Sequence, residues 1–196
     1  MLGATTLGQW NRGQAFIIGW PLLTVRASLG LSDSFDLGLG FDSYYGAMNE
    51  FRGTARVKVA SREGWAFAVV AEAGGALFGS SAQREQRGPR WITGRRNWNV
   101  VPGFVASYQG AGPRAPRLFI DTRYMLAVDL EPYSTDPLSG VPPNIIFGHN
   151  VLLRVGAEVP LSVKTSFLFE LGMDIHGRDI DSVVMPFASL GIVAGL

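Results

Sequence analysis

The sequence contains no cysteine and no long apolar run. Its 196 residues therefore cannot form disulfides, Cys-ligated zinc sites, iron–sulfur clusters or a thiol nucleophile. No stretch approaches 18 consecutive apolar residues, which excludes a transmembrane helix. Charged residues make up only 17%, and 17 basic against 16 acidic residues leave a net charge of +1. That balance argues against a nucleic-acid partner, because such proteins normally show a basic excess.

The start of the chain also lacks the features of an export signal. The first 20 residues have neither a basic n-region nor a continuous apolar core. If the protein is exported, we expect this sequence to be the mature form.

What the sequence has instead is strict alternation of apolar and polar residues. Leu37 and Leu39, for example, alternate with Asp36, Gly38 and Gly40. This period of two predicts β-strands, and no helical periodicity matches it. Nine strands are expected, at residues 23–31, 35–42, 54–59, 65–78, 97–109, 117–130, 150–159, 163–176 and 183–196. A tenth is expected at about residues 12–19, with a bend at Trp20 and Pro21.

The polar face of these strands is rich in glycine and carries charges of both signs. Small residues suit a crowded interior, and near-balanced charges suit an interior ion-pair network. The alternation predicts an inward network made of Arg26, Asp36, Asp42, Arg52, Arg56, Lys58, Glu72, Asp121, Arg123, Asp129, Arg154, Glu158, Lys164, Glu170 and Asp174.

Three further features predict that the apolar face points outward into lipid. Strands of about twelve residues, tilted by about 40°, span roughly 30 Å. Aromatic residues such as Trp20, Trp65 and Trp98 fall near predicted strand ends, as in the interfacial girdles of membrane barrels. Short connections alternate with long ones at residues 79–96 and 131–144, the pattern of short periplasmic turns and long external loops. A soluble lipocalin-like binding barrel is the alternative, supported by Gly8-Gln9-Trp10.

The chain resembles small bacterial outer-membrane β-barrels. Its last residues fit the polar-x-Gly-x-x-apolar assembly signal of that class through Ser189, Gly191, Ala194 and Leu196, with Leu196 where most members have Phe. The resemblance implies an all-β fold, a closed antiparallel up-and-down transmembrane barrel in a Gram-negative outer membrane. It also implies insertion by the barrel-assembly machinery. About ten strands are expected, with eight or twelve as alternatives, after an N-terminal tail at residues 1–11 and with the barrel at residues 12–196.

The expected function is that of a non-enzymatic structural or docking component, either alone or as a subunit of a larger envelope complex, whose external loops form the contact surface. A narrow pore for small solutes or ions is one alternative, disfavoured by the mixed interior charges. A lipid-modifying enzyme is another, for which Asp174, His176 and Ser182 are the only Ser/His/Asp candidates. No cofactor or metal is expected. Five arginines predict contact with lipopolysaccharide phosphates or an acidic envelope partner: Arg84, Arg87, Arg90, Arg95 and Arg96.

Overall fold

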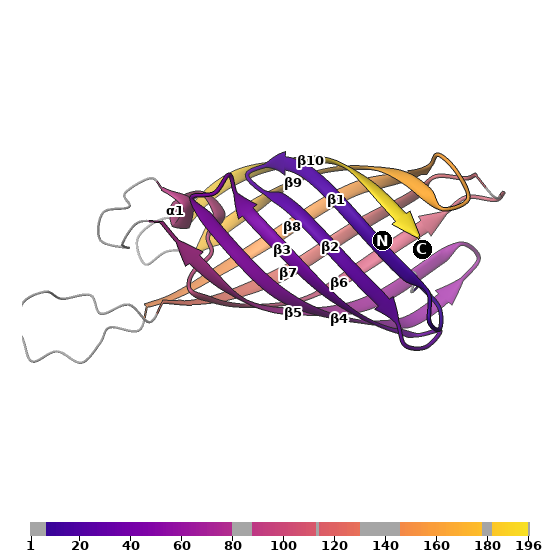
Figure 1. The fold of residues 1–196 in the computed structure, drawn as a ribbon, viewed down its shortest axis with the longest axis horizontal. Coiled ribbons are helices and arrows are strands. Elements are labelled where there is room, and N and C mark those ends of the chain that lie inside the picture. The colour runs from indigo at the N-terminus through magenta and orange to yellow at the C-terminus, as the bar shows by residue number, and fades with distance from the viewer. Residues whose placement is uncertain (1–6, 80–87, 113, 130–145, 178–181, 196) are drawn as a thin grey trace, which may run out of the picture.

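The computed structural model describes residues 7–79, 88–112, 114–129, 146–177 and 182–195 as a closed barrel of ten strands (Figure 1). Every neighbouring pair of strands is antiparallel. The strands are β1 (Arg12–Trp20), β2 (Leu23–Gly30), β3 (Phe35–Tyr44), β4 (Met48–Arg62), β5 (Trp65–Phe78), β6 (Trp98–Gln109), β7 (Arg117–Asp129), β8 (Ile146–Pro160), β9 (Thr165–Gly177) and β10 (Ser182–Gly195). This confirms the predicted fold class and the strand number.

The barrel closes where β1 pairs with β10, from Gly13 opposite Gly195 to Trp20 opposite Ala188. Consecutive strands are joined in up-and-down order, so the connections alternate between the two ends. One end holds both termini, and we call it the termini end; all four of its connections are seven residues or shorter. The short helix α1 (Pro89–Thr93) lies at the opposite end, the loop end (Figure 1).

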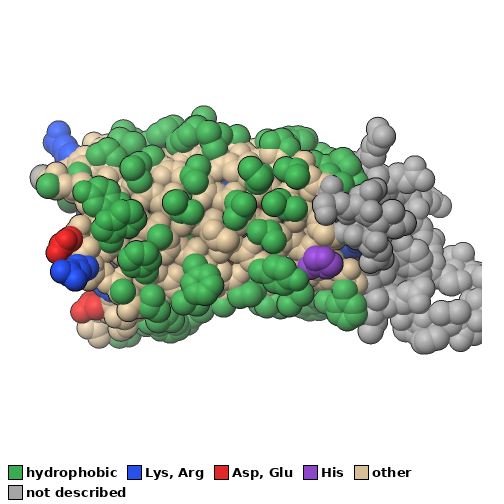
Figure 2. All heavy atoms as spheres, turned by 180° about the vertical axis from the view of Figure 1, so that it is seen from behind, with side chains coloured by type: hydrophobic (Ala, Val, Ile, Leu, Met, Phe, Trp, Pro, Cys, Tyr) green, Lys and Arg blue, Asp and Glu red, His purple; other side chains and the backbone are tan. Residues whose placement is uncertain are grey.

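The apolar face of each strand points out of the barrel. Leu37, Val57 and Phe169 are 43%, 42% and 40% exposed, so they do not meet across a dry centre. Hydrophobic side chains are spread along the wall, and charged ones gather near the termini end (Figure 2). An apolar surface of this extent around a barrel with no free sheet edge is the design of a transmembrane β-barrel.

No helix among the described residues is long and apolar enough to cross a membrane.

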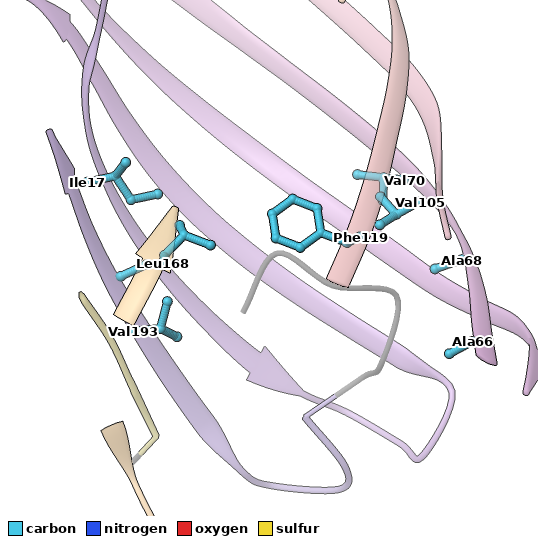
Figure 3. Close-up of a cluster of buried hydrophobic side chains, with 9 residues drawn as sticks. Ile17, Ala66, Ala68, Val70, Val105, Phe119, Leu168 and Val193 are labelled. Carbon is cyan, nitrogen blue, oxygen red and sulfur yellow. The ribbon is translucent and has the colours of Figure 1, made fainter. Parts of the chain in front are cut away.

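The interior near the termini end is apolar, which the sequence pattern did not predict. Ala15, Ile17, Ala66, Ala68, Val70, Val105, Phe119, Leu168 and Val193 form one buried cluster, here called the apolar layer. Figure 3 shows Ile17, Leu168 and Val193 on one side of this layer and Val70, Val105 and Phe119 on the other. Small and medium side chains on inward positions allow the narrow lumen to be filled rather than left open.

We predict that Leu171→Arg, near the middle of β9 on the outer wall, lowers the free energy of unfolding in vesicles by about 2–4 kcal/mol. The cost arises because the guanidinium group would face hydrocarbon without a partner. Val163→Arg is the control, because Val163 lies in the turn before β9 and is fully exposed. Equal effects of the two substitutions in denaturant titrations would contradict the outward placement of Leu171 in lipid.

Candidate functional site

The middle of the lumen is filled by an ion-pair network centred on Arg52 of β4. Its Nη2 lies 2.9 Å from Asp42 Oδ2 and 2.5 Å from Glu50 Oε2, and its Nη1 pairs with Glu72. Asp42 and Glu50 have no solvent-exposed surface. Strands β3, β4 and β5 are therefore joined by charge on their inner faces as well as by backbone hydrogen bonds.

A second set of pairs reaches across the lumen from Glu72. Arg123 Nη1 of β7 lies 2.6 Å from Glu72 Oε1, and Arg26 Nη1 of β2 lies 3.7 Å from the same oxygen. Arg123 also holds Asp121 at 2.5 Å. Because β2, β5 and β7 are not neighbours in the barrel, these contacts are cross-links through the interior.

Two further pairs lie toward the termini end. Arg56 pairs with Asp36, whose carboxylate also accepts a hydrogen bond from the Leu7 backbone N–H at 3.1 Å. Arg117 Nη1 lies 3.3 Å from Glu158 Oε2. Buried charges are tolerated only when they are paired, and these pairs meet that requirement.

The charges inside the described barrel balance. Nine arginines each have a carboxylate within ion-pairing distance: Arg26, Arg52, Arg56, Arg90, Arg95, Arg96, Arg117, Arg123 and Arg154. Nine carboxylates lie buried among them: Asp36, Asp42, Glu50, Glu72, Asp121, Asp129, Glu158, Glu170 and Asp174. A lumen that is neutral overall presents no ring of one sign to select a permeating ion.

Lys164 and Lys58 differ from the predicted network. Lys164 lies in the turn before β9 and is exposed, so it is not part of the lumen; the alternating pattern was extended past the true start of the strand. Lys58 lies on β4 beside a register shift between Lys58 and Ala60, and it is only partly buried.

The arginines assigned to an external contact loop lie inside the mouth of the barrel instead. Arg90 of α1 pairs with Asp129 at 3.2 Å, and Arg96 pairs with the same carboxylate at 3.2 Å. Arg95 holds Asp42 at 3.0 Å and Glu50 at 2.5 Å. Interior carboxylates bind the guanidinium groups of these three residues, and their contact with lipopolysaccharide phosphates stays a prediction. Arg84 and Arg87 lie outside the described residues.

Uncharged contacts complete this plug, which we define as α1 together with Gly94, Arg95 and Arg96. Asn150 Nδ2 donates to Gly94 O at 2.9 Å, and His176 Nδ1 lies 3.1 Å from Trp91 O. Gly94 ends the helix in the left-handed region, with φ of 64°. A Cβ there would lie 2.8–2.9 Å from Asn150 and His176, so glycine is required both by conformation and by space.

Two small cavities lie beside the charged middle of the lumen, apart from one of about 310 Å³ at the termini end. One cavity of about 80 Å³ lies among Asp42, Arg95 and Glu170 in the charged middle, and another of about 40 Å³ lies beside Asp36 and Arg56. Cavities of this size hold a few water molecules. Both of them are lined by Arg26 and Arg123, which bind Glu72.

The residues considered for an enzyme are engaged in structural contacts. Asp174 pairs with Arg154, and the His176 ring lies against the plug. The side chain of Ser182 lies outside the described part of the chain. Within the described residues, no group of three or more His, Asp or Glu side chains could hold a metal ion.

The residues of the predicted assembly signal lie in β10. Ser189 points inward and donates to Glu170 at 2.7 Å. Gly191 also faces inward, where a Cβ would lie 2.7 Å from Phe16 O. Ala194 pairs with Gln14 at the closing seam, and Leu196 lies outside the described residues.

Two interior charges were missed by the sequence pattern: Glu50 and Arg117. Glu50 precedes the expected start of its strand, yet it has the same parity as Arg52 and Arg56, so extending the alternation backward to Met48 would have found it. Arg117 begins β7 with the inward parity of Asp121.

No protein-family model and no curated protein sequence matches the chain. Among solved structures, it is similar to a bacterial polysaccharide outer membrane secretin, with 8% identity and a TM-score of 0.47 over 92% of this chain but only 57% of that one. It is also similar to the KdgM porin in complex with disordered oligogalacturonate (8% identity, TM-score 0.48, 94% and 98% covered). A third is the N-terminal β-barrel domain of Pseudomonas aeruginosa OprF (9% identity, TM-score 0.38, 95% and 96% covered). Likeness this distant transfers no residue role or activity to this chain.

We predict that Glu50→Gln lowers the free energy of unfolding by about 3 kcal/mol, because Arg52 and Arg95 lose a buried counter-charge. Faster trypsin cleavage within the plug should accompany this loss. Glu63→Gln is the matched control: its pair with Arg62 is almost fully exposed, so a change within about 0.5 kcal/mol is expected. Indistinguishable stability of the two variants would contradict the role given to Glu50.

Proposed function

We propose that the protein is a closed, non-enzymatic β-barrel of a Gram-negative outer membrane that serves as a structural or docking component. The observation that carries this proposal is the filled lumen. The plug, the charged middle and the apolar layer follow one another from the loop end to the termini end. Among the described residues, the two cavities beside the charged middle measure about 80 and 40 Å³, and a larger one of about 310 Å³ opens at the termini end beside Ala66, Ser107 and Arg117.

The outer-membrane location is supported by the wall and the turns. The outer face is apolar, and the residues nearest the strand ends include Trp20, Trp65 and Trp98, each exposed by 44–57%. Aromatic side chains at these positions anchor a barrel at the two membrane interfaces. The termini end, with its four short connections, would then face the periplasm, and the loop end, with the two long connections, would face outward.

The docking role follows from the closed lumen of the barrel. A barrel with a sealed interior can act only through its surfaces, and long connections placed on a rigid scaffold are the usual carriers of recognition. The loop end receives residues 79–97 and the connection between β7 and β8, which makes it the contact surface that we propose for an envelope partner.

Planar-bilayer recording tests the closure. We expect the purified, folded barrel to give no unitary conductance steps in 1 M KCl, because interior ion pairs and the apolar layer leave no continuous water path. The folded state is checked by heat-modifiable migration on gels. Regular steps from protein that migrates as folded would contradict closure and would favour the narrow pore.

Photo-crosslinking in cells tests the docking surface. A benzophenone amino acid at Tyr45, which is exposed at the loop end, is expected to form a discrete adduct with another envelope protein. The same amino acid at Val163, which is exposed at the termini end, is the control and should not form that adduct. If neither position gives an adduct, or if both give the same one, the loop end is not a specific docking surface.

A further inference from the structure

The outer wall of the barrel carries a groove of about 870 Å³ that runs across β1 to β6. Its floor consists of small side chains, in contrast to the large apolar side chains that cover most of the wall. The floor residues are Ala27, Gly53, Ala55, Ala71 and Ala73. Strands β1 to β5, which supply most of the groove, face the viewer in Figure 1.

The strand register explains the shape of the groove. Leu39 pairs with Gly53, Gly53 pairs with Ala73, and Ala73 pairs with Val100. Two small residues on adjacent strands are therefore flanked by Leu39, 72% exposed, and Val100, 50% exposed. The next row repeats the arrangement, with Ala55 and Ala71 lying between Leu37 and a proline of β6. The result is a trough over β4 and β5, bordered by the larger outward side chains of β3 and β6.

The end of the groove nearest the termini is polar. Arg12 and Gln14, the first outward residues of β1, line it there. Unlike the nine arginines of the interior, Arg12 has no carboxylate within ion-pairing distance in the part of the chain that the structure describes. The guanidinium group of Arg12 thus stands at the β1 end of the groove, and Leu37 and Leu39 of β3 lie between it and the small residues of β4 and β5.

We propose that this groove is a binding site for a glycerophospholipid with an anionic headgroup. The lipid phosphate lies at Arg12 and Gln14, and an acyl chain lies in the trough over Gly53 and Ala73. Guanidinium groups bind phosphate through charge-assisted hydrogen bonds, which fixes the headgroup. An unfilled trough lacks dispersion contacts along its whole length, and an ordered acyl chain would supply them. The inference rests on the transmembrane placement of the proposed function but not on the closure of the lumen.

A lipid fits this surface better than a second copy of the chain. A two-fold contact through the groove would place two Arg12 side chains at the same depth of one interface. The carboxylate among the residues that line the groove, Glu72, is buried and already paired with Arg52 and Arg123. A phospholipid instead supplies a negative charge at the polar end and hydrocarbon everywhere else, which matches the order of residues along the groove.

Native mass spectrometry tests the site. The full-length barrel is released from nanodiscs of phosphatidylethanolamine and phosphatidylglycerol, and the lipids it retains are counted as the detergent concentration is raised. We expect one phosphatidylglycerol to remain on the wild-type barrel. Arg12→Gln should reduce its retention about fivefold, since a basic side chain at a membrane surface contributes roughly that factor. Retention of phosphatidylethanolamine should fall less, because the ammonium group of its headgroup offsets the charge of its phosphate.

Gly53→Leu fills the trough from its floor and should reduce retention of both lipids. The substitution is sterically free, because a Cβ on Gly53 meets only Ala73 O, at 4.0 Å. Two controls match these changes. Lys164→Gln removes an exposed positive charge at the same end but outside the groove, and Ala157→Leu places a leucine on the wall of β8, which adds three carbon atoms where Gly53→Leu adds four. Neither control should alter lipid retention.

Three outcomes would overturn the site: a wild-type barrel that loses all its lipid as early as Gly53→Leu does, an Arg12→Gln variant that retains phosphatidylglycerol like wild type, or lipid-free dimers in place of lipid-bound monomers. Heat-modifiable migration of each variant shows whether it is folded, so lost binding is not confused with unfolding. If the wild-type chain fails to float with vesicles at all, the proposed membrane function fails together with the site. If it floats and retains no lipid, only the site fails.

Discussion

Hydrocarbon offers neither hydrogen bonds nor counter-charges, and the structure follows from that constraint. Every backbone N–H and C=O in the membrane must find a partner within the protein, so the sheet closes by pairing β1 with β10. Every charged side chain at the depth of the hydrocarbon must turn inward, whereas Arg12 and Arg62 lie at strand ends. The apolar side chains then form the outer wall, and the ten strands enclose a lumen that is crowded with charge.

Because the charged side chains are enclosed in the lumen, their charges must also balance. A guanidinium group held away from water is costly unless a carboxylate lies beside it, and the described lumen meets this condition with nine of each. Most of the pairs join different strands, as Arg123 of β7 does with Glu72 of β5. The same contacts that neutralise the interior also fill it. Closure is therefore a consequence of how the charges are paired, and three of the nine arginines belong to the plug at the loop end.

The sequence was sufficient to predict the strands and the direction of their side chains, which are periodic. It was insufficient for strand ends and for contacts between distant segments, which are not. Alternation identified the strands and the inward position of residues such as Asp42, Arg52 and Glu72, because side-chain direction in a strand depends only on parity. It failed at strand ends, where Glu50 was left out and Lys164 was included. It could not place Arg90 or Arg95, because their carboxylate partners are distant in sequence and nothing local marks a connection that folds back into the barrel. The lipid-facing groove also depends on register, which sets Gly53 beside Ala73 and is not visible in either strand alone.

The central claim is that the outward side chains touch acyl chains, and tryptophan quenching by brominated lipids measures that contact directly. Trp20, Trp65 and Trp98 are exposed on the outer wall. The account predicts strong loss of their fluorescence when the barrel is folded into vesicles whose acyl chains carry bromine. Unchanged emission, from protein that stays dissolved without detergent, would contradict it.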